Sequence, residues 1–320
     1  MLNNIIIDGL AFALPLFIMA IGGIYSEKSG ITNLALEGLQ GVGGFTGALV
    51  AALLMQKLGA ESQIPYYAAM LFAMLGGMLY SMLHAVLCIK FKANQVISGV
   101  VINILAVALT SVLTKVINAG YFGQPSSEFD LGVSQKWTIP YISKIPVLGA
   151  IFTNIYPFQV IIVVVAIVAW YMLYKHRYGL RLRACGDNPH AVDAAGINVG
   201  RIRFTAVMVS GALSGLAGMC FAYSISAKFS VGIYVGYGYL SIAALIFGNW
   251  KIVPTLLTCL LFGFAKSGGY QLVQMAELPS EYSNLFMTLP YVLTLLLLVF
   301  FSKKNDAPRA LGEIYDKGKR

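Results

Sequence analysis

The chain has 320 residues, of which 58% are hydrophobic and only 11% are charged. Soluble domains have about a quarter of their residues charged, so this composition excludes a soluble globular domain and indicates a polytopic membrane protein. The net charge of +9 does not indicate nucleic-acid binding, because many basic residues gather beside apolar runs, in segments 175–203 and 303–320, as on the cytoplasmic side of membrane proteins.

Apolar runs with the length of a membrane-spanning helix, about 20 residues, recur along the chain. They cover residues 5–25, 34–56, 65–89, 94–117, 157–174, 203–226, 237–249, 253–272 and 284–302. The seventh run is short, which is typical of a broken or re-entrant helix, so we expect about nine crossings, within a range of about eight to ten. The sequence therefore predicts an all-α fold with a transmembrane domain over residues 1–302 and a tail over 303–320.

The orientation follows from the charged loops. If the basic loop 175–203 and the tail are cytoplasmic, the remaining loops alternate so that the N-terminus is outside and the C-terminus is cytoplasmic. Segment 118–156 then becomes a long external loop. It is rich in Gly, Pro and Ser and too irregular to cross the membrane.

Small residues are frequent inside the predicted helices. Gly211 and Gly215, and likewise Ser214 and Gly218, are spaced four residues apart, which favours close packing of helices in lipid. A weak internal similarity, which we call the echo, relates Gly30–Asn33 to Gly196–Asn198. Each of these segments precedes a predicted helix rich in small residues. Such an echo raises the possibility of an inverted repeat, which is common in transporters.

Glu37 is the most informative charge inside an apolar run. One interpretation is a polar group that faces a water-filled path. The structural alternative, which we favour, is a buried carboxylate that pins a neighbouring helix or a helix N-terminus.

Other residues could line a translocation path, because aromatic rings mixed with amides and hydroxyls would suit a flat, polar, ring-bearing solute. Most of them are equally compatible with packing and interhelical hydrogen bonds. With Glu37, these candidates are Ser98, Asn103, Ser210, Tyr223, Ser241 and Phe247.

The sequence offers little support for catalysis. Its four cysteines and three histidines show no metal-ligand spacing, and His84 with Cys88 lacks a third partner. No nucleotide-binding loop or hydrolase motif is present, so we expect neither enzyme activity nor a bound metal or cofactor.

The basic loop 175–203 contains the sequence pattern of one short helix. Asp187 or Asn188 can cap its start, Pro189 suits the first helical position, and Gly196 can close its end. Its alanines favour insertion into a protein groove over lipid, where bulky apolar residues would be expected.

These residues resemble those of the permease subunits of ABC importers of the branched-chain amino acid and ribose type. The resemblance is carried by Gly179–Ala184, Gly186–Pro189, Ala194–Asn198 and Ser210–Gly218. Three further pieces resemble the nucleoside-uptake branch of that family, namely Ser29–Asn33 with Glu37-Gly38, Gly238–Trp250, and the tail Ala307–Arg320.

The resemblance implies a bacterial cell-membrane permease that imports nucleosides together with a second related permease, a cytoplasmic ATPase that binds ATP and Mg²⁺, and an external substrate-binding lipoprotein. It also implies that the helix around Asn188–Gly196 is the coupling helix that docks on the ATPase, through Asp187, Asn188, Pro189, His190, Ala191, Asp193, Ala194 and Gly196. Import of a ribose-like sugar or a branched-chain amino acid, an autonomous secondary transporter, and an intramembrane enzyme around Glu37 or His84 are the alternatives.

Overall fold

A computed structural model describes residues 2–59, 61–132, 135–145, 148–277, 279, 281–301 and 306–318. Its described residues are mostly helical, which confirms the all-α prediction. The helices are α1 (Leu2–Lys28), α2 (Leu36–Leu58), α3 (Ile64–Ala85), α4 (Gln95–Ile117), α5 (Pro157–Tyr174), α6 (Arg177–Asp187), α7 (Pro189–Ala194), α8 (Val199–Ile225), α9 (Tyr237–Phe247), α10 (Ile252–Met275), α11 (Glu281–Phe286) and α12 (Leu289–Phe301).

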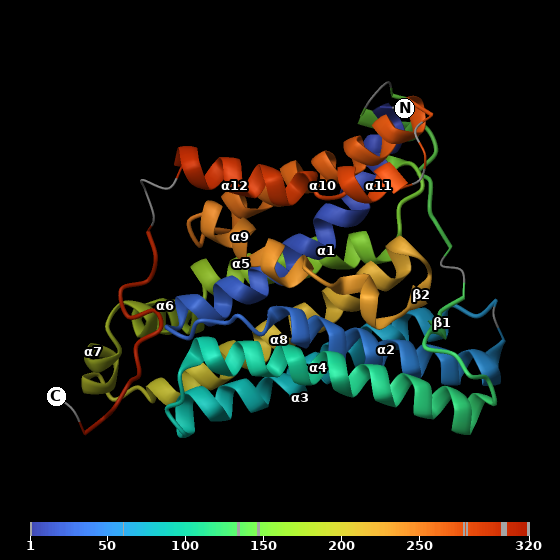
Figure 1. Ribbon diagram of the computed structural model, residues 1–320. Coiled ribbons are helices and arrows are strands. Elements are labelled where there is room, and N and C mark those ends of the chain that lie inside the picture. The colour runs from blue at the N-terminus through green and yellow to red at the C-terminus, as the bar shows by residue number, and fades with distance from the viewer. Residues whose placement is uncertain are drawn as a thin grey trace.

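The long helices run broadly along one axis, from left to right in Figure 1. Helices α6 and α7 and the C-terminal segment gather at one end, and the N-terminus and strands β1 (Phe129–Asp130) and β2 (Lys228–Phe229) lie at the other. The two termini therefore lie at opposite ends of the axis along which the helices would cross a membrane.

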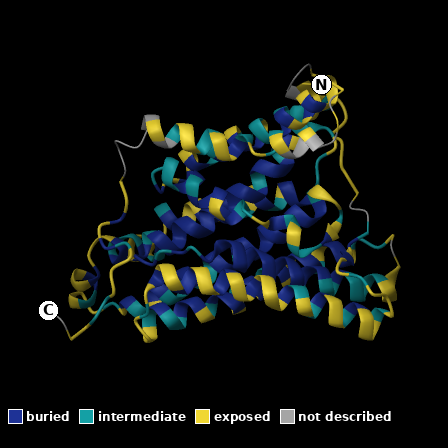
Figure 2. Ribbon diagram, in the orientation of Figure 1, coloured by how far each residue is buried: buried dark blue, intermediate teal, exposed yellow. Residues whose placement is uncertain are grey.

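Helices α1 and α8 form the centre of the bundle. Helix α1 packs against α5, α8, α9 and α10, and α8 also packs against α2 and α3. Figure 2 shows these inner helices largely buried, with the exposed residues on the outer faces of the surrounding helices. Large apolar side chains such as Ile104, Leu257 and Leu295 are exposed there. Since water would disfavour such surfaces, they are suited to lipid or to another membrane subunit.

Glycines allow α2, α3 and α8 to meet closely. A Cβ on Gly43 would overlap the Cα of Gly215, and a Cβ on Gly215 would overlap the backbone oxygen of Ala73. The prediction that small residues permit close helix packing is therefore confirmed.

Seven helices of the described residues are long and apolar enough to cross a membrane. The predicted number of nine is not confirmed, because two of the predicted runs form shorter helices, α9 with 11 residues and α12 with 13. Helix α9 begins directly after Gly236, which has a φ of 91° and is the last residue of the preceding irregular segment. The seventh run is therefore a short, continuous helix, as its length predicted.

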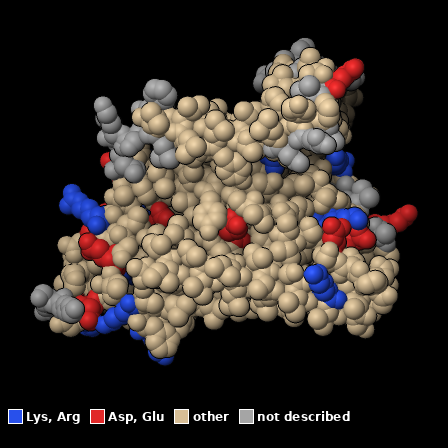
Figure 3. All heavy atoms as spheres, in the orientation of Figure 1, with Lys and Arg blue, Asp and Glu red and all other residues tan. Residues whose placement is uncertain are grey.

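Charge is distributed as expected for a membrane protein. Figure 3 shows Lys and Arg mostly towards the two ends of the axis and a broad, largely uncharged band between them, interrupted by a few acidic and basic atoms. The irregular segment between α4 and α5 lies at one end, where β1 pairs antiparallel with β2.

The echo between Gly30–Asn33 and Gly196–Asn198 does not support an inverted repeat. It precedes α2 and α8, which begin at the same end, since Arg203 on α8 contacts Ser29. Both helices then run towards the paired strands β1 and β2. The two helices are therefore parallel, whereas an inverted repeat would make them antiparallel.

Candidate functional site

The segment between α5 and α8 folds as two short helices, so the prediction of a basic loop with a single helix is wrong for residues 177–187. His176 caps α6, because its Nδ1 accepts a hydrogen bond of 3.2 Å from the backbone N–H of Tyr178. Leu182 and Cys185, three residues apart, lie on one face of α6 and are fully buried. Packing of this narrow apolar face stabilises the helix. The sequence did not indicate it, because the many basic residues leave only a weak apolar pattern.

Helix α7 has the predicted start and end. Asn188 is its N-cap, with Oδ1 accepting a hydrogen bond of 3.0 Å from the N–H of Ala191. Pro189 occupies the first turn, and Gly196 closes the helix with a φ of 77° and a hydrogen bond from its N–H to the oxygen of Asp193. The helix contains 6 residues, so its stability depends on its neighbours.

The two faces of α7 differ in chemistry. Pro189 and Val192 point inward and are buried, whereas Ala191, Ala194 and Ala195 are exposed. Small exposed side chains allow another backbone to approach closely. This face is therefore suited to docking into a groove of a second protein.

A hollow lies between α6 and α7 beside this alanine face. Its volume is about 710 Å³, and Leu180, which is 63% exposed, lines it with Val192. Arg177, Arg181 and Asp187 lie at the same hollow. An apolar hollow with charged neighbours adds a receptive surface for a protein element that carries apolar and polar groups.

The C-terminal segment lies against α7 and the α1–α2 loop. The N–H of Ala310 donates to the oxygen of Gly186 at 2.8 Å, and that of Gly312 donates to Gly30 at 3.1 Å. Tyr315 packs against the ring of His190 at 5.2 Å between centroids. The predicted tail residues 303–305, 319 and 320 lie outside the described residues.

Arg203 joins these elements to α8. It is 2% exposed, and its Nε donates to the oxygen of Ser29 at 3.0 Å while Nη1 donates to the oxygen of Glu313 at 3.2 Å. Burial raises the pKa of the neighbouring Cys185 thiol to about 11, although the Arg203 charge lowers it. Cys185 is therefore an uncharged packing residue at neutral pH, and Arg203 is the polar link from α8 to the α1–α2 loop and the C-terminal segment.

Two path candidates, Glu37 and Asn103, meet at the start of α9. Glu37 Oε2 accepts a hydrogen bond of 2.8 Å from the N–H of Gly236, which confirms the structural alternative of a carboxylate at a helix N-terminus. Asn103 accepts from the N–H of Gly38 at 2.8 Å and donates to the hydroxyl of Tyr239 at 3.2 Å. Because Tyr239 is 47% exposed, this cluster reaches the lateral surface.

The structure does not bring the other path candidates into one site. Ser98 bonds to His84, and Ser210 accepts from the amide of Asn33. Ser241 donates to the backbone of its own helix. The remaining two are aromatic, with Tyr223 against Tyr66 and Phe247 near Phe262.

Lys266 on α10 was missed in the sequence, although a single cation inside the apolar run 253–272 is a recognisable signal of a functional position. Its ammonium donates to the hydroxyl of Tyr237 at 2.6 Å. Among the described residues, His, Cys, Asp and Glu side chains form no group of three or more that could hold a metal ion.

Comparison with known proteins gives consistent matches over the whole chain. The family described as "Branched-chain amino acid transport system / permease component" matches residues 5–298. The guanosine ABC transporter permease protein NupQ of Bacillus subtilis (strain 168) is 38% identical, with 100% of this chain and 98% of the relative covered. The nucleoside ABC transporter permease protein NupC of Lactococcus lactis subsp. cremoris (strain MG1363) is 39% identical, with 99% and 98% covered. The guanosine ABC transporter permease protein NupP of Bacillus subtilis (strain 168) is 23% identical, with 95% and 82% covered.

Proposed function

Because the chain belongs to the family of branched-chain amino acid transport system permease components, we propose that it is the permease subunit of an ATP-driven importer that takes nucleosides into a bacterial cell. The observation that carries the proposal is the full-length similarity, at 38% and 39% identity, to permeases named for guanosine and nucleoside transport. The seven apolar helices would supply the membrane-spanning body of such a subunit.

The surface of α7 is the proposed contact with a cytoplasmic ATPase. Its outward alanines would enter a groove of the ATPase, and the apolar hollow beside them would enlarge the contact. Arg203 would transmit the displacement, because it is a buried link from the adjacent tail and α1–α2 loop to α8. The proposed docking residues are Asp187, Asn188, Pro189, His190, Ala191, Asp193, Ala194 and Gly196.

This assignment sets the orientation in the membrane. Helix α7 and the C-terminal segment share one end of the bundle, and basic residues are concentrated in segment 175–203, which contains α7, and in the tail 303–320. Placing that end in the cytoplasm satisfies the preference of basic residues for the inner side and leaves the N-terminus outside.

The importer would need further subunits. The similarity to both NupQ and NupP, two permeases of one organism, supports a second, related permease as the partner of this chain. ATP and Mg²⁺ would bind to the ATPase subunit, and an external lipoprotein would deliver the nucleoside. The chain itself would bind no cofactor.

The start of α9 is the proposed wall of the translocation path. Transporters commonly use broken helices that end inside the membrane to handle polar groups. Here the N-terminal end of α9 is bonded to Glu37 through Gly236 and to Asn103 through Tyr239. The hydroxyl of the exposed Tyr239 is the polar group of α9 at the lateral surface.

Reconstitution tests the proposal. Proteoliposomes containing the chain, its related permease and the ATPase, supplied with the binding protein, should import radiolabelled guanosine only with ATP, and unlabelled inosine should compete while ribose and leucine should not. Import without ATPase on an ion gradient would favour a secondary transporter. Competition by ribose or leucine, but not by inosine, would favour the sugar or amino acid alternative.

A further inference from the structure

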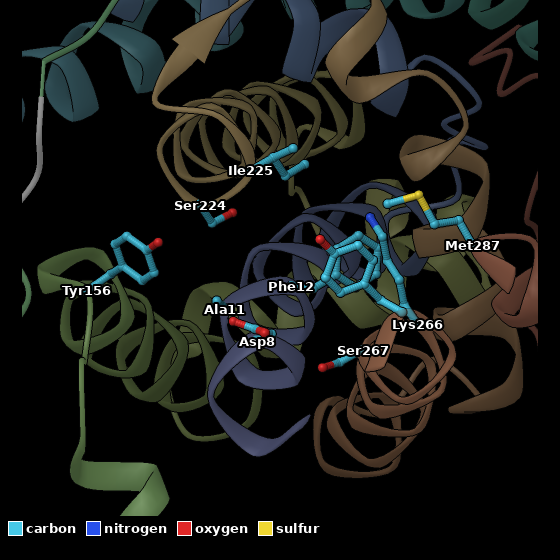
Figure 4. A pocket seen from close by; sticks show the side chains of 10 residues that line it. Asp8, Ala11, Phe12, Tyr156, Ser224, Ile225, Lys266, Ser267 and Met287 are labelled. Carbon is cyan, nitrogen blue, oxygen red and sulfur yellow. The ribbon is translucent and has the colours of Figure 1, made fainter. Parts of the chain in front are cut away.

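A cavity of about 340 Å³ lies near the end of the bundle opposite to α7 (Figure 4). Asp8 is in the first turns of α1, Tyr156 directly precedes α5, and Ser224 is in the last turn of α8. The opposite ends of these three helices lie towards the α6–α7 end. In the proposed orientation, the cavity is therefore on the external side of the transporter.

Lys266 supplies the cation of this cavity. Its Nζ donates to the Tyr237 hydroxyl at 2.6 Å and lies 3.9 Å from the centroid of the Phe12 ring. In the part of the chain that the structure describes, no carboxylate forms a salt bridge with this ammonium. A cation in an apolar helix without a carboxylate partner is costly, and such a residue is a candidate for a role in binding or transport.

Ser267, the next residue, supplies an unsatisfied hydroxyl. Its side chain lines the same cavity and is 6% exposed, and its Oγ has no hydrogen-bond partner among the described residues. Figure 4 shows Ser267 on α10 facing the helix that carries Asp8. A buried hydroxyl without a partner is rare in folded proteins, and a ligand in the cavity would satisfy it.

The cavity has the chemistry of a site for a small, ring-bearing polar solute. Tyr156 and Tyr270 contribute aromatic rings to its lining, Lys266 donates hydrogen bonds, and Asp8 accepts them. Its volume is near the lower end of the range for small-molecule sites, about 300–1,000 Å³.

A second cavity of about 200 Å³ lies beside this site. Phe12, Lys266 and Met287 line both cavities. The second cavity is also lined by Tyr291, whose hydroxyl lies against Gly236 at the start of α9. Phe12, Lys266 and Met287 therefore lie between the external cavity and a second cavity that approaches the Glu37 cluster.

We propose that the external cavity is an acceptor site for a nucleoside on its way from the binding protein to the α9 cluster, an inference that rests on the proposed function. The base accepts a hydrogen bond from Lys266 through a ring nitrogen or carbonyl oxygen. The ribose hydroxyls bond to Asp8 and Ser267. Lys266 thus recognises the base at the boundary between the two cavities.

Protection of a cysteine from labelling tests the site in the complete transporter. The four native cysteines are buried, so Ser267→Cys introduces a thiol in the cavity, and a membrane-impermeant methanethiosulfonate reagent reports its accessibility from outside. Saturating guanosine should slow its labelling at least about tenfold, whereas leucine should not. Ser127→Cys, at an exposed serine preceding β1, is the matched control and should be labelled equally fast with and without guanosine.

Two further variants keep the test decisive. If Ser267→Cys does not assemble, Ser224→Cys at the same cavity replaces it. Lys266→Met should raise the guanosine concentration needed for half-protection at least about tenfold, because a charge-assisted hydrogen bond is lost, and Lys266→Arg should restore part of it.

Guanosine uptake by the same vesicles separates the two proposals. Unprotected or unlabelled cavity cysteines in vesicles that import guanosine would overturn the acceptor site and leave the proposed function intact. Failure of the unmodified transporter to import any nucleoside would instead overturn the proposed function, and the acceptor site with it.

Discussion

The guanidinium of Arg203 on α8 donates from Nε to the backbone oxygen of Ser29 at 3.0 Å, inside a region that is almost completely buried. The contact joins the helix that follows α7 to the loop between α1 and α2. Because Arg203 also reaches Glu313, one side chain ties α8 to two segments that are distant in the sequence. The proposed coupling requires a displacement at the α7 end to reach α8 through this polar contact.

Replacing Arg203 tests this link. Arg203→Lys keeps the charge but loses the planar fork of donors, so one hydrogen bond from a charged group, worth about 1.5–3 kcal/mol, is lost. We expect the melting temperature of the purified chain in detergent to fall by about 3–10 °C. Arg201→Lys, at an exposed position two residues earlier, should change it by less than about 2 °C. Equal changes in the two variants would contradict a structural role for Arg203.

We expect Glu37 to stabilise the start of α9 both by its negative charge and by the hydrogen bond that it accepts from Gly236. Glu37→Gln retains an acceptor for Gly236 but removes a charge at the helix N-terminus, which should cost about 0.3–1 kcal/mol of unfolding free energy. Glu37→Ala leaves the N–H of Gly236 without that partner and should cost about 1–3 kcal/mol. Thermal unfolding, with Glu61→Ala in an exposed turn as the control, measures both losses. If Gln and Ala had equal effects, the hydrogen bond would be unimportant.

Cys185 should be unreactive at neutral pH. Burial raises the pKa of its thiol to about 11, so the folded protein holds it protonated at pH 7.5. Because this folded-state pKa exceeds the unfolded value of about 8.5, its contribution to stability is complete below about pH 8.5 and is lost as pH rises towards about 11. Labelling by N-ethylmaleimide, followed by mass spectrometry, should be slow at pH 7.5 and accelerate towards pH 11. Rapid labelling at pH 7.5 would show that α6 does not bury this residue.

Local sequence patterns predicted those features that depend on neighbouring residues. The start and end of α7 follow from Asn188, Pro189 and Gly196, because caps and positive φ angles are properties of a few consecutive residues. The apolar runs likewise located the membrane helices. Helix α6 was missed, because its stability comes from the burial of Leu182 and Cys185 against distant segments.

Long-range relationships could not be read from local patterns. The contact of the tail with Gly186 and Gly30 depends on how the chain returns to the α7 end. The same holds for Glu37, whose pairing with Gly236 joins residues 199 positions apart. Lys266 is different, because its position inside an apolar run was visible, and only its aromatic neighbours required the structure.

The most direct test of the account is the number of guanosine molecules imported per ATP hydrolysed by the reconstituted transporter. Ala194→Glu places a charge on the exposed face of α7, and an unpaired charge in a docking interface should reduce this ratio at least about tenfold. Ala307→Glu, at an exposed alanine of the C-terminal segment, should leave the ratio unchanged at an equal amount of chain in the membrane. If Ala194→Glu imported guanosine with the ratio of the unmodified chain, α7 would not be the element that couples ATP hydrolysis to transport.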